Sequence, residues 1–170
     1  MRRTITVWIG LASVLCVAGW IVWSNERILA HGQVVRLELA PADPRSLMQG
    51  DYMMLNYALV NALRLAQARD DGFAVVRLDS RRVATLVRIQ SGSNFARSTG
   101  EPQAANEVAL HFRVRNHRLK IATNAFFFQE GHGLEFRDAR YGEFRVGSNG
   151  EPRLTALLDG EFNRLGENRY

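Results

Sequence analysis

Two side chains of this 170-residue sequence have the types needed for nucleophilic catalysis. Ser46 precedes a Gly-Asp turn at Gly50 and Asp51, and Lys120 is the only lysine of the chain. In a Ser-Lys dyad the amine takes the proton of the serine hydroxyl, which then attacks a carbonyl. A lone lysine at the end of an arginine-rich strand is more often a solvated surface residue. We therefore keep the dyad only as an alternative and assign no catalytic residue.

A metal site would need several histidines and carboxylates brought together by the fold. The available groups are His111, His117, Glu130 and His132. The glycines beside His132 predict a turn, and no His-x-x-x-His pair lies on a helix. Cys16 is the only cysteine and lies in an apolar segment, which excludes disulfides and cysteine-based zinc sites elsewhere. We expect no metal and no cofactor.

An aromatic run at residues 126–128 is the strongest candidate for binding. Three consecutive phenylalanines in a strand cannot all face one core, so at least one ring points outward or into a second layer. The strand could be buried on both faces under a helix, or it could belong to a contact surface. The candidate binding residues are Phe127, Phe128, Glu130 and His132.

The composition predicts a folded domain without nucleic-acid binding. Hydrophobic residues make up 46% of the chain and charged residues 23%. The net charge of +5 is small, and the arginines are scattered along predicted strands rather than massed. A solvated basic surface explains this pattern.

The N-terminal segment predicts a membrane anchor. Residues 5–23 carry no charge and would form a helix of about 28 Å, the thickness of the bilayer hydrocarbon. The run is longer than the apolar part of a cleaved signal peptide and lacks a good cleavage site. Arg2 and Arg3 mark the cytoplasmic side. We expect a cytoplasmic stub (1–3), a transmembrane signal-anchor helix in the lipid bilayer (4–24) and an extracytoplasmic domain (30–170), which in a bacterium places the domain in the periplasm at the inner membrane.

Alternating apolar residues predict that the domain is mainly β, an antiparallel sandwich or barrel-like fold of about eight strands with one short helix. The helix is expected over residues 59–69, and residues 164–170 are expected to fray. The expected strands are 33–40, 52–57, 73–78, 83–89, 108–114, 119–123, 143–146 and 154–158.

The segment GDYMMLNY at residues 50–57 matches the GDYXXLXY family at every fixed position. The chain resembles that family over almost its whole length, with further matching residues at 43–47, 128–131 and 139–143. The resemblance implies a membrane-anchored bacterial protein without an assigned activity. It also implies a companion of multi-pass membrane proteins.

The motif itself reads first as a folding element. Leu55 and Tyr57 are two residues apart in a strand and share one face, whereas Tyr52 lies on the other. Gly50 can adopt a positive φ at the turn, and Asp51 can cap nearby amides.

The anchor, the aromatic run and the family resemblance together predict an accessory module that contacts a multi-pass membrane protein. The alternatives are a signal-peptidase-like serine hydrolase and a metal-binding periplasmic domain.

Overall fold

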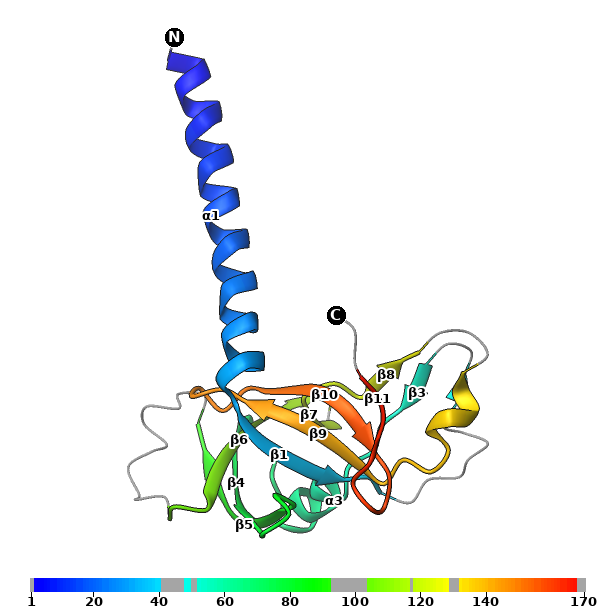
Figure 1. Ribbon diagram of the computed structural model, residues 1–170. Coiled ribbons are helices and arrows are strands. Elements are labelled where there is room, and N and C mark those ends of the chain that lie inside the picture. Colours follow the sequence, from blue (N-terminus) through cyan, green and yellow to red (C-terminus); the bar gives the residue numbers. More distant parts are fainter. Residues whose placement is uncertain are drawn as a thin grey trace.

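The computed structural model describes residues 2–40, 48–49, 52–92, 104–116, 118–128 and 132–167. One long helix rises from a domain of antiparallel strands (Figure 1). The mainly β fold class predicted from the sequence is confirmed.

Helix α1 (Arg2–His31) is longer than the predicted span. The residues after Trp23 include Glu, Arg, Leu and Ala, which favour helix, so nothing ends it at residue 24. Within Val7–His31, an 18-residue window has a mean hydropathy of 1.9 and no residue buried by the domain, so α1 is long and apolar enough to cross a membrane. The helix ends at His31, and a Cβ atom on the next residue, Gly32, would lie 2.4 Å from the Ile28 carbonyl oxygen. Only this glycine separates α1 from the first strand.

The first four-stranded sheet carries the strand that follows α1. Its order is β1-β9-β10-β11, with β1 (Gln33–Glu38), β9 (Tyr141–Val146), β10 (Pro152–Leu158) and β11 (Arg164–Glu167). The prediction that the chain frays from residue 164 is wrong for β11. Asp159 accepts hydrogen bonds from the amides of Glu161 and Asn163, and this turn folds β11 back onto β10.

The second four-stranded sheet has the order β5-β4-β6-β7. Its members are β4 (Gly72–Leu78), β5 (Ala84–Ser91), β6 (Glu107–Arg115) and β7 (Arg118–Ile121), which lie where the sequence predicted the strands 73–78, 83–89, 108–114 and 119–123. The short helix α3 (Ala58–Leu65) buries Leu59 and Leu63 against the core and leaves Leu65 86% exposed. It lies where the sequence predicted a helix, and it packs against β5, β7 and β1.

A third, smaller sheet joins the motif to the aromatic run. It consists of β2 (Met48–Gln49), β3 (Tyr52–Met54) and β8 (Ala125–Phe127), in the order β2-β3-β8. The motif strand is shorter than predicted, because the ladder stops after Met54 and Tyr57 forms only an isolated bridge with Leu39.

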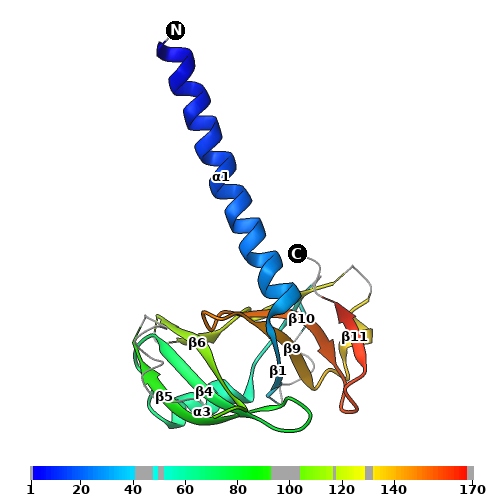
Figure 2. The ribbon, with the colours of Figure 1, turned by 60° about the vertical axis from the view of Figure 1, so that its left-hand side comes forward.

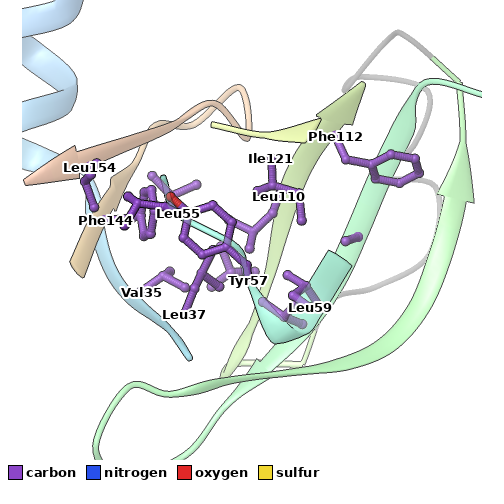
Figure 3. Close-up of a cluster of buried hydrophobic side chains, with 14 of the residues drawn as sticks. Val35, Leu37, Leu55, Tyr57, Leu59, Leu110, Phe112, Ile121, Phe144 and Leu154 are labelled. Carbon is purple, nitrogen blue, oxygen red and sulfur yellow. The ribbon is translucent and has the colours of Figure 1, made fainter. Parts of the chain in front are cut away.

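The two large sheets and α3 pack their buried side chains into a shared hydrophobic core. Figure 3 shows Tyr57 at its centre, between Phe144 on one side and Leu110 and Ile121 on the other. These four side chains are 2% exposed or less. The motif tyrosine therefore fills the space between the sheets, in the interior of the domain.

Candidate functional site

The motif lies along the segment that leads into the aromatic run. The Leu55 amide donates to the Asn124 carbonyl at 2.7 Å, and the Tyr57 hydroxyl donates to the Thr123 carbonyl at 2.6 Å. Leu55 and Tyr57 are each 2% exposed, as the alternation predicted. Gly50 and Asp51 lie outside the described residues. The described part of the motif thus fixes where residues 123–127 run.

This pairing decides which phenylalanine is exposed. Phe126 faces inward and is 1% exposed, whereas Phe127 faces outward and is 65% exposed. Phe127 is the cross-strand partner of Tyr52, and the two ring centroids are 5.9 Å apart. The alternative of a strand buried on both faces is therefore wrong. Phe128 is half-buried and packs 5.4 Å from the ring of Phe136.

An open groove of about 450 Å³ runs past these rings, and we call it the aromatic groove. It lies between β8, the 3₁₀ helix η1 (Gly133–Phe136) and β11, which gather at one end of the domain (Figure 1). β8 and β11 are each the last strand of their sheet among the described residues. The lining residues are Phe126, Phe127, Phe128, His132, Glu135, Phe136, Leu165, Gly166 and Glu167.

The floor of the groove depends on a glycine. A Cβ atom at Gly166 would lie 2.5 Å from Cε1 of Phe136, so no side chain fits there without moving that ring. Phe136 is itself 6% exposed and stacks edge-on against Phe126 at 5.0 Å. The close approach of β11 and η1 therefore holds Phe136 and Phe126 as a rigid apolar floor.

The rim of the groove is polar. His132 Nδ1 lies 2.6 Å from Glu135 Oε1, and both side chains are about half exposed. Glu167, which is also exposed, stands at the β11 side and accepts a hydrogen bond from Arg164. Glu130, which the sequence analysis named as a candidate binding residue, lies outside the described residues. An apolar centre with a polar rim is the usual organisation of a protein contact surface.

Strand β11 is held in place by a buried carboxylate. Glu143 is 5% exposed and accepts from Arg36 at 3.3 Å and from Arg164 at 2.8 Å. The Arg36 guanidinium also lies over the ring of Phe162, 4.9 Å from its centroid. Because Arg164 begins β11, the ion pair with Glu143 positions one wall of the aromatic groove.

Among the described residues, those proposed for other chemistry do not come together in one site. Lys120 is exposed on β7 and stands opposite Arg113, while Ser46 and His117 lie outside the described residues. His111 bonds to Glu151 at 2.7 Å, whereas His132 bonds to Glu135. Among the described residues no three His, Cys, Asp or Glu side chains lie close enough to share a metal ion.

Comparison with known proteins identifies the family of this chain. The family model described as "GDYXXLXY protein" matches residues 14–157, which is most of the chain. The chain belongs to the GDYXXLXY family. No curated protein and no solved structure matches it. In this member of the family, Tyr52 contacts Phe127, whereas Leu55 and Tyr57 form part of the core.

Most of the groove outside the aromatic run was not singled out from the sequence. The structure adds the lining residues Glu135, Phe136, Leu165, Gly166 and Glu167 and the supporting Glu143, and only the fold brings η1 and β11 next to residues 126–128. Glu143 alone carried a signal, since it lies in the segment 139–143 that resembles the family.

Proposed function

We propose that this chain is a membrane-anchored accessory module of the bacterial inner membrane, whose aromatic groove binds an extended segment of a multi-pass membrane protein. The observation that carries the proposal is the exposure of Phe127. The side chain is 65% exposed on β8, a strand at the edge of its sheet that pairs with the motif strand β3. A large exposed aromatic ring beside a groove is the kind of anchor that dominates protein interfaces. No hydrolytic or metal-dependent activity is part of the proposal.

The two strands beside the groove are the reason to propose that the bound segment is extended. β8 and β11 end their sheets among the described residues, and an edge strand offers backbone donors and acceptors to an incoming strand. The outer face of β3 and β8 adds Tyr52 and Met54, which is 43% exposed, next to Phe127. Backbone pairing would supply affinity, and these side chains would select apolar residues of the occupant.

Helix α1 is the reason to propose a membrane protein as the partner. A spanning helix that leads into β1 after one glycine would keep the groove close to the bilayer. Such confinement raises the effective concentration of the domain toward proteins in the same membrane. It also places apolar loops of integral proteins within reach.

The anchoring and orientation can be tested with one cysteine. In spheroplasts, a variant with Cys16→Ser and Asp70→Cys should react with a membrane-impermeant maleimide, because Asp70 is exposed on the domain. The chain should stay in the membrane pellet after a carbonate wash. Labelling only after permeabilisation would contradict the periplasmic placement. A mature chain that begins near His31 would contradict the anchor.

The binding function is tested by copurification from native membranes. Phe127→Asp should reduce the amount of the multi-pass partner at least about tenfold, since a lost anchor of 2 kcal/mol or more has that effect. Leu65→Asp is the matched control, because Leu65 is also an exposed apolar residue but lies on α3 outside the groove. Absence of any multi-pass protein with wild type, or equal recovery with Phe127→Asp, would contradict the proposal.

A further inference from the structure

A second surface combines positive charges that oppose one another. On the β6-β7 hairpin, Arg113 stands directly opposite Lys120, and Arg115 stands opposite Arg118. Like charges in such positions destabilise a pair of strands. The alternate residues of both strands, such as Phe112 and Ile121, face the core, so the four cations share the outer face.

Arg153 on β10 extends this surface. It is opposite Arg145 in the β9-β10 pair, which is again a pair of like charges. A pocket of about 360 Å³ is lined by Arg153 together with three of the hairpin cations. We call Arg113, Arg115, Arg118, Lys120 and Arg153 the basic face.

The carboxylates near the basic face neutralise only part of it. Glu151 accepts from Arg113 at 2.7 Å, and Asp71 accepts from Arg115 at 3.0 Å. The Val114 amide and then Arg115 hold the pKa of Asp71 below its usual value, so this carboxylate stays charged. Among the described residues, no carboxylate forms an ion pair with Arg118, Lys120 or Arg153.

The basic face lies beside the foot of α1. The loop at residues 147–151 contacts both. On one side, the His111 amide of β6 donates a hydrogen bond to the Gly150 carbonyl at 2.8 Å. On the other side, a Cβ atom placed on Gly147 would lie 3.0 Å from the Ile28 side chain of α1. The same loop lines a cleft with Trp20 and Trp23. Tryptophan rings favour the headgroup level of a bilayer. Figure 2 shows the β9-β10 hairpin at the base of the helix.

We propose that the basic face binds the phosphate of an anionic phospholipid headgroup, of the phosphatidylglycerol type. Unneutralised cations next to a spanning helix attract anionic lipid, and the phosphate relieves the repulsion between the opposed arginines and lysine. This inference rests on the membrane anchoring proposed above. It does not depend on the occupant of the aromatic groove.

The test uses the full-length chain in neutral detergent micelles, with lipid adducts counted by native mass spectrometry. Phosphatidylglycerol should bind at least about tenfold more tightly than phosphatidylcholine. The variant Lys120→Glu/Arg153→Glu should lose that preference, while Arg64→Glu/Arg69→Glu should keep it. Both variants change two exposed cations, but those of the control lie near α3. Unchanged melting temperatures show that the variants are folded.

Three results would overturn the inference. The first is a charge-reversed basic face that keeps the affinity of the wild type for phosphatidylglycerol. The second is equal binding of both lipids by the wild type. The third is displacement of the lipid by an equal concentration of inorganic phosphate, which would identify a site for free anions. Because the chain is placed in micelles directly, a failure here is distinct from a failure of anchoring, which the carbonate wash reports.

Discussion

Replacing Tyr57 with alanine is expected to lower the free energy of unfolding by about 3–5 kcal/mol, the range for large aromatic side chains removed from a core. Tyr57 is 2% exposed and lies edge-on to Phe144 with ring centroids 5.6 Å apart. Its hydroxyl satisfies the Thr123 carbonyl, which would lose that partner. Pulse proteolysis of the full-length chain in urea and mild detergent measures the change.

Two further variants separate the contributions of Tyr57. Tyr57→Phe keeps the ring, removes the hydroxyl that donates to the Thr123 carbonyl, and should cost about 1 kcal/mol. Leu65→Ala changes a residue that is 86% exposed and should cost almost nothing. If Tyr57→Ala unfolds at the same urea concentration as wild type, the motif is not a folding element and its tyrosine serves another purpose.

Replacing Glu143 with alanine is expected to cost about 2 kcal/mol. Removing one partner of a fully buried ion pair costs about 3–5 kcal/mol because a charge stays buried and unpaired. Here the arginines reach solvent, with side-chain exposures of 23% for Arg36 and 52% for Arg164, which reduces the loss. The same urea measurement applies, and proteolysis near β11 should increase first.

The matched control for Glu143 is Glu167. Both carboxylates accept from Arg164 at 2.8 Å, but Glu167 is 67% exposed. Glu167→Ala should therefore change stability by less than about 0.5 kcal/mol, as is usual for an exposed ion pair. Equal effects of the two substitutions would show that burial of Glu143 contributes nothing to holding β11.

The sequence alone predicted those elements whose structure depends on the spacing of apolar residues along the chain. The alternation over β1 and β6 predicted these strands, and the two-residue spacing of Leu55 and Tyr57 predicted their shared inward direction. The uncharged run predicted a helix suited to a membrane. The length of this helix was underestimated, because residues that favour helix continue beyond the apolar run and α1 ends only at His31.

The site could not be predicted from local patterns, because it depends on pairing between distant segments. Whether Phe126 or Phe127 is exposed is decided by the register of β8 against β3. Gly166 reaches Phe136 only because the Asp159 turn returns the chain as β11. The opposed cations of the basic face likewise become neighbours only through strand register.

The most direct test of the central claim is a photocrosslink from the exposed ring itself. A benzoylphenylalanine placed at Phe127 of the full-length chain, in native membranes, should form an adduct with an extended segment of a multi-pass membrane protein. The same group at Leu65, which lies outside the groove, should not form that adduct. Mass spectrometry of the joined peptides identifies the partner and the segment. An adduct common to both positions, or none from Phe127 with the domain folded, would contradict the account.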